Sequence, residues 1–307
     1  PFGIFSILYA IFKLRNITPN KDIKLDIFSL ILSSLGFGGL LYGFSSVGDF
    51  GWTSSHVIIA ITIGFLALVI FVVRQWKMDD PMLDFAVYKF PMFALSSIIS
   101  VTISASMFSG MLLTPLYVQT VRGISPFYSG ILMLPGAIVM GIMSPITGRL
   151  FDKYGAKALA IIGLSILVVT TYLLSFLTME DSYFYLMTLY TTRMFGMSLV
   201  MMPVMTNGLN ELPMRMNPHG TAMNNTLQQV SGAIGSAILL TIMTKHSETV
   251  GIALQKQAAE GKTFEFDIEL LAMLEGINHT FFISTIFALI ALLLALFIRR
   301  PNIPNIH

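Results

Sequence analysis

The sequence predicts an all-α polytopic membrane protein, and three observations support this fold class. Hydrophobic residues make up 55% of the 307 residues and charged residues only 11%, which is too little charge to keep a globule of this size in solution. Eight runs are each long enough to cross a bilayer about 30 Å thick as a helix, and only one of them contains a charged residue. None shows the alternation over about ten residues that is typical of a barrel strand, and lipid forces the backbone to satisfy its own hydrogen bonds.

The first 89 residues are expected to hold one helix end and two full spans. Residues 1–14 are interpreted as the end of a truncated helix, because their apolar run covers only about half a membrane span, and residues 15–26 as a cytoplasmic loop. Because no signal peptide precedes this run, we interpret the chain as the C-terminal portion of a longer protein. Two transmembrane helices are expected over residues 27–73, followed by a polar, proline-broken cytoplasmic joint over residues 74–89.

Six further spans predict a six-helix C-terminal bundle over residues 90–300. They cover residues 90–121, 123–148, 158–179, 182–210, 216–244 and 276–298. The hydrophilic segment 245–275 is expected to be an outer loop, in which the Ala, Gln and Glu content around residues 253–260 allows a short surface helix. A solvated connection is the simplest role for this loop, and gating or partner binding is the alternative. Residues 301–307 are expected to form a cytoplasmic tail.

The basic residues are distributed unevenly between the two sides of the membrane. If successive loops lie on alternate sides of the membrane, 13 of the 18 Lys and Arg residues fall on one side and four on the other, and Arg193 lies inside a span. Positive residues accumulate on the cytoplasmic side of membrane proteins, so the richer side and the C-terminus are predicted to be cytoplasmic.

A short charged loop separates the spans 123–148 and 158–179. It carries three basic residues, one acid and two glycines, which predicts a tight cytoplasmic turn. Its candidate functional residues are Gly148, Arg149, Asp152, Lys153, Gly155 and Lys157.

Arg193 is the one charged residue expected deep in the membrane. It lies about ten residues into its span, hence roughly 15 Å deep at 1.5 Å per residue. A charge at this depth is costly and is therefore a functional candidate, whose partner would be a carboxylate, a carbonyl or water. No acid of this chain is expected at that depth, so a carboxylate would come from an absent N-terminal half or from a charged substrate. The alternative is an interfacial, snorkelling or helix-packing arginine.

The span 216–244 carries four carboxamides within six positions. Together with small residues at helical spacing they form a wide polar face, which belongs against other helices or a water-filled cavity. Two interpretations of this face are equally possible: its side chains form hydrogen bonds to neighbouring helices, or they contact a substrate. The density of carboxamides favours the second, in which the face lines a cavity. The residues are Asn224, Asn225, Gln228 and Gln229.

Several chemistries find no support in the sequence. The chain has no cysteine, its five histidines show no metal-ligand spacing, and it contains no Ser-His-Asp set, P-loop or nucleotide-binding fingerprint. We therefore expect neither an enzyme nor a metal, nucleic-acid or ATP-binding protein. Glu211, near the inner interface, is interpreted as a structural cap in preference to a proton carrier.

The charged loop resembles the G-x-L-x-D-[RK]-x-G-[RK]-[RK] signature of the major facilitator superfamily and departs from it at Ala156. Further motifs extend the resemblance to the EmrB/QacA drug-resistance branch of this superfamily, especially to lincomycin-resistance-type exporters. These motifs lie at residues 80–84, 134–137, 144–146, 193–196, 201–203 and 219–229. The resemblance covers nearly the whole chain. It implies fourteen helices, of which this chain would hold the end of helix 6, an inserted pair and the whole C-terminal bundle.

The same resemblance implies proton-coupled export of drugs or other amphiphiles by alternating access, in a bacterial cell membrane. The energy source would be the proton gradient, without a cofactor, and the partners would be a small amphiphilic substrate, the lipid bilayer and the missing N-terminal half. The main proton-binding carboxylate would lie in that half, so no residue here inherits its role. The charged loop would form helix-end contacts that hold one state of the transport cycle.

Three alternatives remain open at this point. Within the same fold, the alternative function is that of an uptake permease or a dedicated metabolite exporter. A rival from another class is a non-transporting membrane scaffold or sensor. An intramembrane enzyme is disfavoured, because no nucleophile and base share a helix face.

Overall fold

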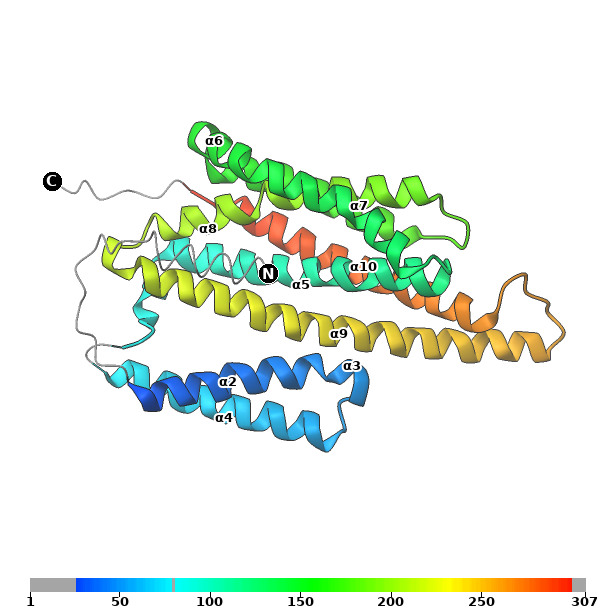
Figure 1. Cartoon of the computed structure of the whole chain (residues 1–307), viewed down its shortest axis with the longest axis horizontal. Helices are drawn as coiled ribbons and strands as arrows, with labels where there is room; N and C mark the ends of the chain where they lie inside the picture. Colours follow the sequence, from blue (N-terminus) through cyan, green and yellow to red (C-terminus); the bar gives the residue numbers. More distant parts are fainter. Residues whose placement is uncertain (1–25, 79–80, 300–307) are drawn as a thin grey trace.

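The computed structural model describes residues 26–78 and 81–299, and their regular structure is helical (Figure 1). Six of the described helices are long and apolar enough to cross a membrane, which confirms an all-α polytopic membrane protein. The helix end expected over residues 1–14, nearly all of the loop 15–26 and the tail 301–307 lie outside the described residues.

The helices follow one another in the order expected from the hydrophobic runs. Their bounds are α2 (Ile27–Ser45), α3 (Val47–Phe50), α4 (Ser55–Lys77), η1 (Phe85–Lys89), α5 (Pro91–Leu116), η2 (Tyr117–Val121), α6 (Pro126–Leu173), η3 (Leu174–Phe176), α7 (Tyr183–Ser198), α8 (Met201–Leu209), η4 (Met214–Met216), α9 (Asn217–Ala259) and α10 (Ile268–Ala295).

Helix α6 supplies two of the expected spans, because the chain reverses within it at Gly155. This residue has φ 78° and ψ 170°, a conformation that favours glycine. The reversal is the tight turn predicted from the charged loop. Ala156, which departs from the signature, is buried in the core, where a basic side chain would be costly.

Helices α7 and α8 together form a span that is interrupted at Leu199 and Val200. Pro203, in the first turn of α8, lacks the backbone N–H that a continuous helix would use. In α7, Gly196 packs so closely on α6 that a β-carbon there would lie 2.8 Å from the carbonyl oxygen of Gly163. The span is therefore both interrupted and closely packed on α6.

Helix α9 is longer than expected, because it continues without a break to Ala259. Helix α10 begins at Ile268, so most of the segment 245–275 is helical, and Figure 1 shows the two helices running past the rest of the bundle. Ser247 and Gly276 are in close contact in this extension. Helix-forming Ala, Gln and Glu residues and continued packing against α10 explain why α9 does not end with its apolar run.

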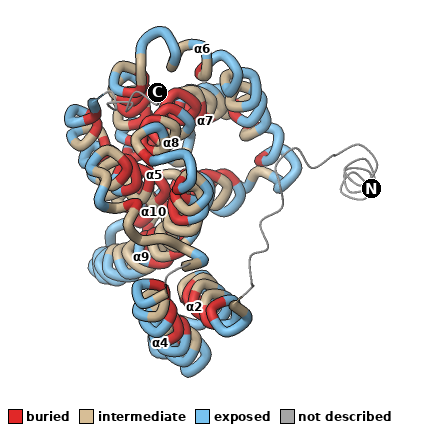
Figure 2. The backbone as a smooth tube through the Cα atoms, turned by 90° about the vertical axis from the view of Figure 1, so that its left-hand side faces the viewer, coloured by how far each residue is buried: buried red, intermediate tan, exposed pale blue. Residues whose placement is uncertain are grey.

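The hairpin of α2 and α4 lies beside α9, outside the main bundle (Figure 2). A β-carbon at Gly39 would lie 2.9 Å from the backbone of Gly64, so the glycines bring α2 and α4 together. The indole nitrogen of Trp52 donates a hydrogen bond of 2.7 Å to the hydroxyl of Thr241, which attaches one end of the hairpin to α9.

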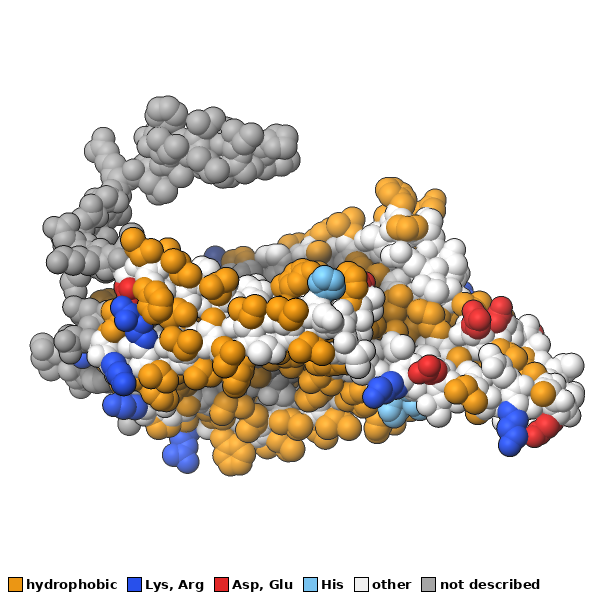
Figure 3. Space-filling view, turned by 90° about the horizontal axis from the view of Figure 1, so that it is seen from below, with side chains coloured by type: hydrophobic (Ala, Val, Ile, Leu, Met, Phe, Trp, Pro, Cys, Tyr) orange, Lys and Arg blue, Asp and Glu red, His pale blue; other side chains and the backbone are white. Residues whose placement is uncertain are grey.

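The surface has the distribution expected of a membrane protein. In Figure 3, hydrophobic side chains cover the middle of the face. Lys and Arg gather at the end where α9 begins, and acidic and basic side chains are mixed at the end where α9 and α10 meet. The basic residues of this face thus gather at one end, and that this end is cytoplasmic stays a prediction.

Candidate functional site

Arg193 is fully buried between three helices of the bundle. Its Nη2 donates a hydrogen bond of 2.5 Å to the carbonyl oxygen of Ser106 on α5, and its Nε donates one of 3.3 Å to the hydroxyl of Thr171 on α6. Its Nη1 has no hydrogen-bond partner among the described residues. The charge is therefore held by a carbonyl and a hydroxyl, and the side chain links α5 and α6 to α7.

No carboxylate pairs with Arg193 within residues 26–78 and 81–299, where the one ion pair joins Arg74 and Asp26. Since the side chain is 0% exposed, a carboxylate from elsewhere would reach it only if the bundle opened. The arrangement favours the helix-packing interpretation, and direct substrate contact stays a prediction. Ser106, Gly110 and Thr171, which surround the guanidinium, could not be paired with Arg193 from the sequence. For Ser106 and Gly110 the available signal was the run of small residues in 96–110.

The four carboxamides of α9 do not converge on one point. Asn224 is buried, Gln228 is half-buried, and Asn225 and Gln229 are exposed. Exposed carboxamides are unfavourable in lipid, so the side of α9 that carries Asn225 and Gln229 is the one suited to a polar cavity.

The small residues of the same face serve a different purpose. A β-carbon at Gly235 would lie 2.9 Å from Ala105 of α5, and Gly232 lies against the ring of Phe108. The polar face expected from the sequence is thus divided: its glycines bring α9 against α5, and two of its carboxamides remain open.

The charged loop presents its side chains to the outside. Arg149, Asp152, Lys153 and Lys157 are exposed and form no ion pair within the described structure. The Nζ of Lys153 lies 5.1 Å from the ring centroid of Tyr154. The charges, together with the half-buried Gly148 and Gly155, are available for a contact outside the described residues, which stays a prediction.

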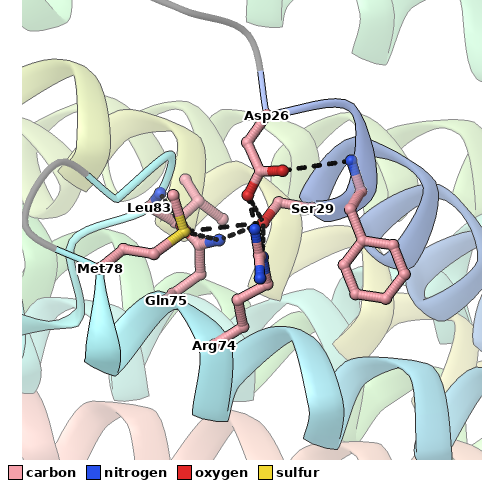
Figure 4. A network of polar contacts seen from close by, with 7 residues as sticks. Asp26, Ser29, Arg74, Gln75, Met78 and Leu83 are labelled. Atoms are coloured by element: carbon pink, nitrogen blue, oxygen red, sulfur yellow. Dashed lines mark hydrogen bonds and ion pairs between the residues drawn. The ribbon is translucent and has the colours of Figure 1, made fainter.

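A polar network joins the two ends of the α2–α4 hairpin to the joint that follows (Figure 4). Asp26 accepts hydrogen bonds from Arg74 Nε at 3.0 Å and from the hydroxyl of Ser29 at 2.6 Å. Gln75 donates to Ser29 at 2.8 Å and accepts from the backbone N–H of Leu83 at 3.2 Å. The hydrogen bond from Arg74, followed by that from Ser29, lowers the pKa of Asp26 to about 2.

Glu211 caps a helix. Its carboxylate accepts hydrogen bonds from the backbone N–H groups of Met92 and Phe93, at 2.6 and 3.1 Å, at the start of α5. Negative charge is favourable at a helix N-terminus. The interpretation of Glu211 as a structural cap is confirmed.

Comparison with known families and proteins agrees with this architecture. The family model described as Major Facilitator Superfamily matches residues 27–236. The chain is 41% identical over 304 residues to an uncharacterized MFS-type transporter, YcnB of Bacillus subtilis, covering 99% of this chain and 61% of that protein. It is 42% identical over 302 residues to the lincomycin resistance protein LmrB of Listeria monocytogenes, covering 98% of this chain and 63% of that protein.

A solved structure shares the fold. It is a bacterial homolog of the human lysosomal transporter Spinster, in an inward-facing and unoccupied conformation, with a TM-score of 0.52 and 13% sequence identity. The match covers 86% of this chain and 67% of that one. The chain thus spans less than two thirds of the length of the two curated relatives.

Proposed function

This chain belongs to the major facilitator superfamily, and we propose that it is the C-terminal portion of a transporter that exports drugs or other amphiphilic small molecules in exchange for protons. The observation that carries this proposal is the 42% identity to a lincomycin resistance protein over 98% of the chain. Transport by a family member requires no enzyme chemistry. The protein would lie in the plasma membrane of a bacterium, with its C-terminus in the cytoplasm.

The geometry supports a cavity wall on α9. Asn225 and Gln229 are polar, exposed and on a helix long enough to span the membrane. Groups of this kind can hydrogen-bond a passing substrate in an aqueous cavity without a fixed charge. The N-terminal half of the transporter would close the other side of that cavity.

Proton coupling is assigned to the part of the transporter outside this chain. The described acids lie outside the apolar runs, and two of them have structural roles, because Asp26 is paired with Arg74 and Glu211 caps α5. A group that loads and releases protons needs a pKa near the working pH. We therefore expect the coupling carboxylate in the N-terminal half, and the proton gradient, without a cofactor, as the energy source.

The test uses the full-length transporter in everted membrane vesicles with an imposed pH gradient. An exporter should accumulate lincosamides or cationic dyes when the lumen is acidic, and a protonophore should abolish the accumulation. An uptake permease would move its substrate in the opposite direction. The absence of any gradient-dependent flux would favour a scaffold or sensor and overturn the proposal.

A further inference from the structure

A cavity of about 460 Å³ lies between the α2–α4 hairpin and the bundle. Phe44 comes from α2, Phe108 and Met111 from α5, and Leu240 from α9, so most of its wall is apolar. The volume lies within the range of about 300–1,000 Å³ that small-molecule sites occupy. Neither Asn225 nor Gln229 lines it, although Ser236 in its wall lies seven residues, about 10 Å, beyond Gln229 on the same face of α9.

One carboxylate borders this apolar cavity. Asp49 lies on α3, is exposed, and has no ion-pair partner in the part of the chain that the structure describes. Trp52 follows three residues later, and tryptophan is enriched where a membrane meets water. The cavity thus has an apolar body inside the membrane and one negative charge at the interface.

We propose that this cavity binds an amphiphilic monocation, with the apolar body between Phe108 and Leu240 and the positive group beside Asp49. An anionic amphiphile would be repelled by the carboxylate, and a neutral one would gain nothing from it. The thioether of Met111 and the two aromatic rings accept apolar bodies of different shapes. The proposal concerns binding alone, so it does not require that the protein transports the ligand.

Trp52 provides a local readout. Its ring centroid lies 6.1 Å from that of Phe44, which lines the cavity. A nitroxide bound in the cavity should therefore quench the fluorescence of Trp52, and the difference between the wild type and Trp52→Phe isolates this signal in the full-length transporter. The probes are three nitroxide-labelled alkyl chains of equal length that end in a trimethylammonium, a hydroxyl or a carboxylate group.

We expect the ammonium probe to quench Trp52 at about tenfold lower concentration than the alcohol, which corresponds to ~1.4 kcal/mol. Asp49→Asn should abolish this preference and Asp49→Glu should keep it. Glu265→Gln, which removes an exposed acid in the turn between α9 and α10, should change nothing. Ser236→Phe, which fills the cavity, should abolish quenching by all three probes while the melting temperature shows an intact fold.

Three results would overturn the proposal. Equal quenching by the three head groups would show that the cavity takes lipid-like chains of any charge. A preference that survives Asp49→Asn would place the cation elsewhere. No quenching of Trp52 in the full-length protein would show that another part of the transporter fills the cavity.

Discussion

The guanidinium of Arg193 lies against the backbone of Gly110, in the space that a β-carbon at position 110 would occupy. The hydrogen bond from Arg193 to Ser106 is one helical turn away on the same helix, α5. Glycine at position 110 is therefore what lets α5 approach α7 with an arginine between them. This contact connects a buried charge to the packing of the bundle.

Replacing Gly110 by alanine should displace the guanidinium and destabilise the bundle. Overpacking of this kind typically costs about 1–3 kcal/mol, although alanine is the better helix former by about 1 kcal/mol. The matched control is Gly141→Ala on α6, where a β-carbon would meet no atom within 4 Å. Thermal unfolding of the full-length protein should show a lower melting temperature for Gly110→Ala alone; equal melting of both variants would contradict the packing.

Arg193→Ala should impair transport more than Arg193→Lys. The alanine variant loses both hydrogen bonds and leaves a cavity, and large-to-small changes of buried side chains cost about 2–5 kcal/mol. Lysine keeps the charge and can still donate to the carbonyl oxygen of Ser106. Initial flux, measured at matched expression, checks this order, and wild-type flux in both variants would remove Arg193 from the mechanism.

The local features of the fold could be predicted from the sequence, because each depends on a short stretch of chain. The lengths of the apolar runs predicted the spans, and the charged loop with its two glycines predicted the tight turn that the structure has at Gly155. That Glu211 caps a helix was predicted from its place near the inner interface, but the helix that it caps, α5, is distant in the sequence and was not predicted. Contacts between distant helices could not be predicted, because the sequence does not show which side of a helix meets which neighbour. The place of Gly110 beside Arg193 and the division of the α9 face are of this second kind.

Gln229→Leu should change which substrates the transporter prefers, with little effect on its stability. Gln229 is exposed on α9, so the substitution creates no buried gap. A lost hydrogen bond to a substrate is worth about 0.5–1.5 kcal/mol, which predicts a change of roughly two- to tenfold in its relative rate of export. Ile238→Leu, an exposed apolar position on the same helix, is the control. An unchanged profile over a panel of substrates would count against cavity lining by Gln229.

Asp26 should keep the start of α2 attached to the joint well into the acid range. Its pKa is lowered to about 2 from 3.8, so the carboxylate stabilises the fold above the unfolded pKa, and this contribution is lost as the pH falls towards 2. Asp26→Asn should therefore increase hydrogen exchange at the start of α2 at pH 7 and still do so at pH 3.5. A difference that has already halved near pH 3.8 would show that the hydrogen bond from Arg74 does not form.

Labelling of single cysteines would decide the sidedness on which the orientation depends. Tyr154, in the charged loop, is 53% exposed, and Thr263, in the turn between α9 and α10, is exposed at the opposite end of the molecule. Residues 1–307 contain no cysteine, so this part of the transporter gives no background. With a membrane-impermeant maleimide, Tyr154→Cys should react in everted vesicles but not in intact cells, and Thr263→Cys should show the reverse. The basic residues gather at the end that holds Tyr154, and positive residues accumulate on the cytoplasmic side of membrane proteins. A reaction of Tyr154→Cys in intact cells would therefore show that the protein has the opposite orientation in the membrane, with the open carboxamides of α9 reversed with it.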